Sequence, residues 1–260
     1  MNSEALTEEN RTYWTGRASG YSKVVEQELL SRQKEKWKAV LQREMEGHFA
    51  GQKKRPLKAL DAGTGPGFFA VLLSELGCEV TAIDLTAEML EKARENSRDC
   101  GGWIRFLEMN TEDLSFEDEC FDLVVSRNLT WNLPHPEAAC REWNRVLKPG
   151  GLLLNFDANW YRYLFDEKAR KAYEKDREVS AEKGIADLNV GENFDVMEDI
   201  ACRIPLSGIE RPMWDLAVLS SLGMCAEADP HVYKRVWSEE EKINFLSTPM
   251  FMVRAVKPAV

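Results

Sequence analysis

The sequence is poor in the features that mark membrane, secreted and nucleic-acid-binding proteins. No apolar run approaches the roughly 18 residues of a transmembrane helix, and the first residues are polar and acidic. We therefore expect no membrane partner, no secretory signal and a cytoplasmic location. Basic residues are in the minority, with 34 Lys and Arg against 44 Asp and Glu and a formal net charge of −10. Binding to a phosphate backbone normally requires a basic face, so we expect no nucleic-acid partner, and Lys53–Arg55 is interpreted as a solvated basic loop.

Cysteine and histidine are scarce and scattered. The cysteines occur singly, at positions 78, 100, 120, 140, 202 and 225. None forms a Cys-x-x-Cys pair, which favours reduced cysteines in a cytosolic protein; thiol capture of a soft metalloid such as arsenite is the alternative. No cluster has metal-ligand spacing, so we predict no metal site. His135 lies between two prolines and is interpreted as part of a structural turn, with a general base as the alternative.

What the sequence does contain is a glycine turn in residues 57–70. The segment reads Leu-Lys-Ala-Leu-Asp61-Ala-Gly63-Thr-Gly65-Pro-Gly67-Phe-Phe-Ala. An apolar run ends in an acid, three glycines follow at alternate positions, and a helical pattern begins. Glycine lets a ligand lie against the main chain, and the N–H groups at a helix start favour an anionic or strongly polar ligand group. A tight turn without a ligand is the structural alternative.

The spacing of these glycines discriminates between cofactors. A dinucleotide site needs Gly-x-Gly-x-x-Gly, but Phe68 stands at the third glycine position, and no Gly-Lys-Ser/Thr phosphate loop is present. The Asp-x-Gly-x-Gly-x-Gly form instead resembles motif I of the class I S-adenosylmethionine (SAM) methyltransferases. The order of motifs resembles that family over residues 57–157.

A second predicted strand, over residues 79–84, ends in Asp84, 21 residues after the first motif glycine. A carboxylate near that distance can accept hydrogen bonds from both hydroxyls of a ribose, and capping of the helix that starts near Thr86 is a compatible role. Leu85 and Met89 follow, where an apolar wall for an adenine ring is useful.

Further strands are predicted over residues 104–110, 121–126 and 152–156, with a helix over 136–147. The family commonly has Gly-Asp-Ala after its third strand, whereas this chain has Met109-Asn110-Thr111. An Asn amide can still accept from the adenine amino group and donate to a ring nitrogen.

The resemblance implies an α/β, Rossmann-like doubly wound sheet of about seven mostly parallel strands with an antiparallel C-terminal hairpin. It also implies SAM as cofactor and S-adenosylhomocysteine (SAH) as product. Asp61 would receive the ammonium group, and the glycines would pass beside the amino-acid end. The cofactor-binding residues predicted in this way are Tyr13, Tyr21, Asp61, Gly63, Gly65, Gly67, Asp84, Leu85, Met89, Asn110, Thr111, Glu112 and Asn128.

An aromatic-rich lead-in, residues 12–21, resembles that of small-molecule members of the family and precedes a predicted amphipathic helix over about residues 22–46. We expect Tyr13 and Tyr21 to close the methionine end of the cofactor. The alternative is that these aromatic residues pin the helix to the core, and for Trp14 we prefer that interpretation.

The acceptor is expected beyond the carboxyl end of the fifth strand, where ligands of open α/β sheets bind. Asp157 is the candidate general base, although a lone Asp at a strand end is often only a helix cap. Asn159 and Trp160 are predicted to contact the acceptor, and Trp131 with Asn128 to line the passage to it.

We expect residues 1–50 to form an N-terminal helical cap and residues 51–260 the SAM-binding domain, with a lid inserted at about 161–211. Within the lid, residues 166–183 are predicted to form a charged helix. After it we predict a helix over 212–223 and closing strands over 225–236 and 250–256.

The function predicted from these motifs is SAM-dependent methyl transfer to an N, O or S atom of a small molecule, with positioning as the main catalytic device. A non-catalytic SAM- or SAH-binding regulator on the same fold is the alternative. A protein or RNA methyltransferase is a third alternative. Against it, the Asn-Pro-Pro-aromatic motif that is common for amide and base nitrogens is missing, and the chain reads Arg127-Asn-Leu-Thr130 after the fourth predicted strand. The sequence does not predict the acceptor's identity or the oligomeric state.

Overall fold

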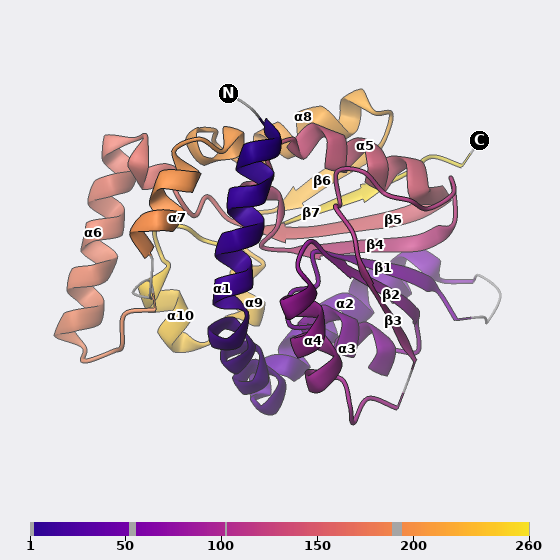
Figure 1. Ribbon diagram of the computed structural model, residues 1–260, viewed down its shortest axis with the longest axis horizontal. Helices are drawn as coiled ribbons and strands as arrows, with labels where there is room; N and C mark the ends of the chain where they lie inside the picture. Colours follow the sequence, from indigo (N-terminus) through magenta and orange to yellow (C-terminus); the bar gives the residue numbers. More distant parts are fainter. Residues whose placement is uncertain (1–2, 52–55, 102, 189–193, 260) are drawn as a thin grey trace.

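The computed structural model describes residues 3–51, 56–101, 103–188 and 194–259, and the basic cluster Lys53–Arg55 lies outside them. Within these ranges the strands form one sheet of seven, in the order β3-β2-β1-β4-β5-β7-β6 (Figure 1). They are β1 (Lys58–Ala62), β2 (Glu79–Asp84), β3 (Ile104–Glu108), β4 (Phe121–Arg127), β5 (Leu147–Asp157), β6 (Cys225–Asp229) and β7 (Phe251–Val256). The first five pair in parallel, and β7 is antiparallel to both β5 and β6. The predicted fold class is confirmed.

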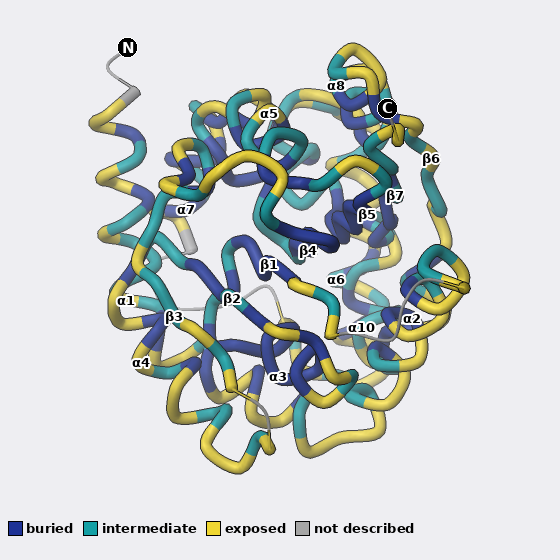
Figure 2. The backbone as a smooth tube through the Cα atoms, turned by 90° about the vertical axis from the view of Figure 1, so that its right-hand side faces the viewer, coloured by how far each residue is buried: buried dark blue, intermediate teal, exposed yellow. Residues whose placement is uncertain are grey.

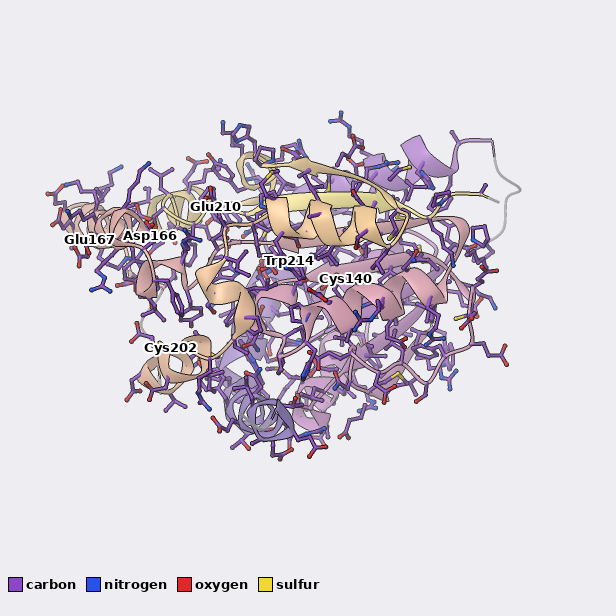
Figure 3. The ribbon with its side chains drawn as sticks, turned by 90° about the horizontal axis from the view of Figure 1, so that it is seen from above. Cys140, Asp166, Glu167, Cys202, Glu210 and Trp214 are labelled. Carbon is purple, nitrogen blue, oxygen red and sulfur yellow. The ribbon has the colours of Figure 1, made fainter. Side chains whose placement is uncertain are left out.

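Helices cover both faces of this sheet and its carboxyl edge. They are α1 (Ser3–Leu30), α2 (Arg32–Phe49), α3 (Phe68–Glu75), α4 (Ala87–Asn96), α5 (Pro136–Val146), α6 (Glu167–Glu182), α7 (Phe194–Ala201), α8 (Met213–Ser221), α9 (Tyr233–Val236) and α10 (Glu239–Asn244), with 3-10 turns η1 (Thr130–Asn132), η2 (Arg162–Leu164) and η3 (Pro205–Gly208). Figure 3 shows α5 and α8 side by side on one face, with Cys140 on the first and Trp214 on the second. Helices α2, α3 and α9 pack on the other face.

Alternation along the strands divides the core into two layers. Ala59 belongs to the layer under α2 and α3, and its neighbour Leu60 to the layer under α5. Side chains of successive strand residues point to opposite faces, so strands buried on both faces are apolar throughout. Trp37 and Trp143 are the largest fully buried side chains, one in each layer. Figure 2 shows the buried strands at the centre and exposed segments around them.

The N-terminal prediction is wrong in one respect. The aromatic lead-in is not a separate segment, because it lies inside α1, which runs unbroken from Ser3 to Leu30. The predicted helix over 22–46 is instead divided at Ser31, whose hydroxyl accepts a hydrogen bond from the Gln33 N–H and caps α2. In Figure 1 helix α1, in indigo, stands between α7 and α4, both of which it contacts.

Two further predictions are corrected near the C-terminus. The closing strand predicted over 225–236 ends at Asp229, because Pro230 follows and residues 233–236 turn into α9. Within the predicted lid, α7 is a helix that we did not predict, because the helix predicted there covers only residues 166–183. No helix among the described residues is long and apolar enough to cross a membrane.

Candidate active site

A cavity of about 440 Å³ lies at the carboxyl edge of the sheet, above β1 and β4, where the strand order reverses. Ligands of open α/β sheets bind at such a switch point. Of the predicted cofactor residues, the lining includes Tyr13, Tyr21, Asp61, Gly63, Gly65, Asp84, Leu85, Met89, Asn110, Thr111, Glu112 and Asn128. Trp131 and Trp160 also line it. Gly67, Asp157 and Asn159 do not.

The glycine turn has backbone angles that favour glycine. Gly63, Gly65 and Gly67 all have positive φ, at +68°, +51° and +91°. A Cβ on Gly63 would lie 2.7 Å from the Leu129 methyl carbons, and one on Gly67 would lie 3.0 Å from the Cβ of Ala93 on α4. Gly63 therefore keeps the cavity floor open, whereas Gly67 permits close packing of the α3 start against α4.

Asp61 is a buried acid beside this turn. Its Oδ2 accepts a hydrogen bond of 2.6 Å from the Thr64 hydroxyl, and the residue is 2% exposed. Burial raises the pKa of Asp61 to about 7, and the Thr64 bond opposes that rise. A cationic group in the cavity would favour the ionised form of this carboxyl.

Asp84 joins the two loops that flank the cavity. Its Oδ2 accepts from the Gly65 N–H at 2.9 Å, and its Oδ1 accepts from the N–H and the hydroxyl of Thr86, each at 3.0 Å. Burial raises the pKa of Asp84, and the bonds from Thr86 and Gly65 oppose this. These bonds hold Asp84 against Thr86, the residue before α4, without capping a free N–H of that helix, and a carboxylate has further lone pairs for ribose hydroxyls.

The loop after β3 is held by its own side chains. The Asn110 Oδ1 accepts from the Glu112 N–H at 3.0 Å, and the Thr111 hydroxyl accepts from the Trp143 indole at 2.8 Å. The Glu112 carboxylate accepts from the His135 N–H at 2.6 Å and so fixes the start of α5. His135 is thus part of a structural turn, as interpreted, while the Asn110 NH2 group is left to donate to a ligand.

Helix α1 closes the cavity from above. Its Asn10 side chain donates to the Asn132 carbonyl at 2.8 Å, and its Arg11 side chain donates to the Leu85 carbonyl at 2.6 Å. Tyr21, about three turns further along α1, lies over the glycine turn, with a ring carbon 3.5 Å from where a Gly65 Cβ would be.

The assignment of Asp157 as a base is wrong. Its carboxylate is fully buried, accepts from the Trp131 N–H at 2.9 Å, and pairs with the Arg211 guanidinium at 2.5 Å. Asn159 donates to the Arg211 carbonyl and accepts from its N–H, each at 3.0 Å. Both side chains therefore hold Arg211, the last residue of the predicted lid, and neither lines the cavity.

Aromatic rings form the other end of the cavity. Trp131 stacks on Tyr161 at 5.0 Å between ring centroids, and Trp160 contacts Phe245 at 5.4 Å and Trp237 at 6.4 Å. The sequence predicted Trp131 and Trp160 at this end of the cavity. It did not predict Trp237 and Phe245, which follow the short helices α9 and α10 between β6 and β7.

Two arginines that line the cavity were also missed. Arg17 lies on α1, and Arg127 ends β4, where its guanidinium pairs with Glu28. The signal for Arg127 was available, because it ends a strand at the same sheet edge as Asp84.

The comparisons with known proteins agree with this geometry. Residues 60–155 match the family model described as a methyltransferase domain. The ubiquinone biosynthesis O-methyltransferase of Xanthomonas euvesicatoria pv. vesicatoria (strain 85-10) is 36% identical over 98 residues. Residues 60–155 therefore form a domain of the methyltransferase family. The aligned part is 37% of this chain and 41% of that relative, so the match spans less than half of either protein.

Solved structures of this family have the same fold. A SAM-dependent methyltransferase from Aquifex aeolicus superimposes with a TM-score of 0.50 at 20% identity, over 77% of this chain and 82% of its own. A phosphoethanolamine N-methyltransferase from Haemonchus contortus, in complex with phosphomonomethylethanolamine and SAH, gives a TM-score of 0.55 at 18% identity, over 85% of this chain and 52% of its own.

The residues present fit the cofactor of this family. The side-chain oxygens of Asn128 and Asn132 are buried at the cavity without a hydrogen-bond partner among the described residues. Asn128 also has a positive φ, +55°, which is uncommon outside glycine and clusters at functional sites. These two amide oxygens lie in the same cavity as the glycine turn. They can accept hydrogen bonds from the N–H and O–H groups of the amino-acid and ribose parts of SAM.

Proposed function

We propose that the protein transfers the methyl group of SAM to an N, O or S atom of a small-molecule acceptor. One observation carries this: a single cavity joins the glycine turn and Asp84 to an aromatic chamber formed by Trp131, Tyr161 and Trp160. A donor at the first end and an acceptor at the second would meet within one enclosed space. The O-methyltransferase relative supports a small-molecule acceptor.

In this proposal the chain's own residues bind and orient. Asp61 takes the ammonium group, Asp84 the ribose hydroxyls and Asn110 the adenine edge, while Met89 forms an apolar wall. The bound SAM supplies an electrophilic methyl group on a sulfonium. The acceptor atom attacks that carbon in line, the carbon–sulfur bond breaks with its electron pair going to sulfur, and an acceptor that carried a hydrogen releases a proton.

Positioning is the main catalytic device that the cavity offers. Asp157 is held by Arg211, and none of the three histidines lines the cavity. Burial raises the pKa of Tyr161, so its phenol is a neutral donor near pH 7. The proposal therefore assigns no general base, and an acceptor with a low proton affinity or a neutral attacking atom suits it best.

We further propose that residues 1–50 act as a cap and residues 161–211 as a lid, because both segments contribute to the cavity lining. The cap contributes Tyr13 and Tyr21, and the lid contributes Tyr161 and Tyr163. Exclusion of water by these two segments favours an enzyme over a protein that only stores the cofactor. A cytoplasmic location remains part of the proposal.

Release of SAH separates the enzyme from a non-catalytic binding protein. Purified protein is incubated with methyl-labelled SAM and a panel of small phenols, amines, thiols and carboxylic acids. The proposal expects SAH and labelled product in equal amounts with at least one acceptor class. Tight SAM binding without SAH formation over the whole panel would favour the regulator.

A further inference from the structure

We infer that the cavity contains a carboxylate-binding subsite formed by the Nη1 group of Arg127 and the Nε1 group of Trp37. The inference rests on the proposed function and deepens it, because it names the chemical group that this end of the cavity recognises. Both residues line the cavity, and both donor groups are buried without a hydrogen-bond partner among the described residues.

The Arg127 guanidinium is fixed on two sides. Its Nη2 donates to both carboxylate oxygens of Glu28, at 2.7 and 2.8 Å. Its central carbon lies 4.6 Å from the centroid of the Phe68 ring, 5.0 Å from Trp37 and 5.8 Å from Phe69. The Nη1 edge is left free on a planar donor that is already held in place, which is the geometry that recognises carboxylates.

Trp37 supplies the second donor from a different element. It lies on α2, is 1% exposed, and has an indole N–H with no partner among the described residues. Most buried indole N–H groups find an acceptor. Two unpaired donors on side chains that pack together, with the Arg127 guanidinium carbon 5.0 Å from the Trp37 ring centroid, point to a ligand with two acceptor oxygens.

The nearest acidic side chains do not satisfy these donors. Both oxygens of Glu28 are taken by the Nη2 of Arg127. Glu241 accepts from the Ser238 N–H in a capping box and from the Gln33 side chain. Since the Arg127–Glu28 pair is neutral overall, recognition at this subsite relies on directed N–H bonds more than on net charge.

Two carboxylates could reach this subsite. Ser126 pairs with Ala62, so Arg127 lies beside Gly63 across the β1–β4 boundary, where the amino-acid end of the cofactor is proposed to sit. The aromatic chamber with Trp160 adjoins the same cavity, so a carboxylate on the acceptor is the other source. The shared chemistry is a carboxylate, and the experiment distinguishes the two sources.

The test uses two variants of the full chain. Trp37→Phe removes the indole N–H together with part of the bicyclic ring and keeps a phenyl ring in the core. The double variant Glu28→Gln/Arg127→Gln removes the guanidinium without leaving a buried unpaired charge. Trp214→Phe, on the opposite face of the sheet, is the matched control. Circular dichroism and thermal melting establish that each variant is folded.

Calorimetry then compares four probes. SAH is compared with 5′-methylthioadenosine, which lacks the amino-acid carboxylate. Benzoate is compared with its neutral isostere benzamide, each titrated into ligand-free and SAH-loaded protein. If the cofactor carboxylate binds here, the double variant weakens SAH binding about tenfold or more and leaves 5′-methylthioadenosine unchanged. If an acceptor carboxylate binds here, SAH binding is unchanged in both variants. Wild-type protein then binds benzoate more tightly than benzamide, and both variants lose this preference.

The inference is overturned if SAH binding is unchanged in both variants and wild-type protein shows no preference for benzoate over benzamide. Failure of the proposed function has a different signature, since neither SAH nor 5′-methylthioadenosine would then bind wild-type protein. In that case the benzoate titration of ligand-free protein still decides whether the subsite exists.

Discussion

Among individual residues, Asp61 couples the proposed cofactor site to pH. Burial raises its pKa to about 7, and an ammonium group favours its ionised form. We therefore expect SAH binding to release a proton and the affinity to fall about tenfold per pH unit below 7. Asp61→Asn is expected to weaken binding at higher pH and to flatten this dependence. Calorimetry in buffers of different ionisation enthalpy measures both, and a pH-independent wild-type affinity would contradict the assignment.

The same pKa shift has an opposite effect on the ligand-free protein. The carboxyl has an ordinary pKa of 3.8 and a folded pKa of about 7, so its contribution to stability is fully present below pH 3.8. That contribution is lost as the pH rises through 7, because the folded state resists ionisation. The neutral Asp61→Asn side chain is therefore expected to raise the melting temperature of the ligand-free protein at alkaline pH.

The variants Gly63→Ala and Gly77→Ala form a matched pair that tests whether the main chain at Gly63 contacts the ligand. Both have positive φ, +68° and +82°, but a Cβ at Gly63 would meet Leu129 at 2.7 Å and one at Gly77 would meet nothing within 4 Å. Gly77→Ala is expected to cost about 1–2 kcal/mol of unfolding free energy from backbone strain alone. Gly63→Ala is expected to cost more and also to weaken SAH binding. Urea denaturation measures the stability of each variant. Equal SAH affinities of the two folded variants would argue against a ligand beside Gly63.

At the scale of elements, Arg211 is the last residue of the proposed lid and joins the end of β5 to α8. Its buried guanidinium pairs with Asp157 and Asp215, each at 2.5 Å. Arg211→Leu leaves two buried carboxylates without a counter-charge, and we expect a loss of about 3–5 kcal/mol in unfolding free energy. Lys171→Ala breaks an exposed ion pair on α6 and should change stability by less than about 1 kcal/mol. Urea denaturation of both variants tests this, and equal losses would refute the structural role.

The elements that the sequence predicted well are those with local signals. The strand–glycine turn–helix of residues 57–75 and the strand Glu79–Asp84 formed as expected, because apolar runs, turn glycines and helix caps act within a few residues. The N-terminal helix was misjudged because residues 12–21 were interpreted as a lead-in that precedes the helix, yet they lie inside α1 together with Gly16 and Gly20. Contacts with α4 and α7 support that helix despite its glycines.

The residues that sequence reasoning misjudged depend on distant partners. Asp157 looked like an exposed strand-end acid, but its partner Arg211 lies 54 positions later. Trp37 carries no motif, and its proximity to Arg127 follows only from the packing of α2 and α3 beside β4. Local patterns therefore predicted many of the cavity-lining residues near the glycine turn and fewer of those at the aromatic end.

Across the whole molecule, one cavity collects side chains from the N-terminal helix, the strand ends, the lid and the stretch before β7. Only part of this assembly, residues 60–155, corresponds to the shared methyltransferase domain. The aromatic chamber and the arginine-bearing end come partly from outside it, from residues such as Trp37, Trp160 and Trp237. Acceptor choice is thus expected to depend on the segments that surround the shared domain.

Titration calorimetry with SAH tests the central claim most directly. Wild-type protein is compared with Asp84→Ala, and with Asp99→Ala, which removes an exposed acid in the loop after α4. The account predicts micromolar or tighter binding to wild type and Asp99→Ala, and loss of that binding in folded Asp84→Ala. No binding to wild type at millimolar SAH, or unchanged binding to Asp84→Ala, would contradict the proposal that the glycine turn and Asp84 form a SAM site.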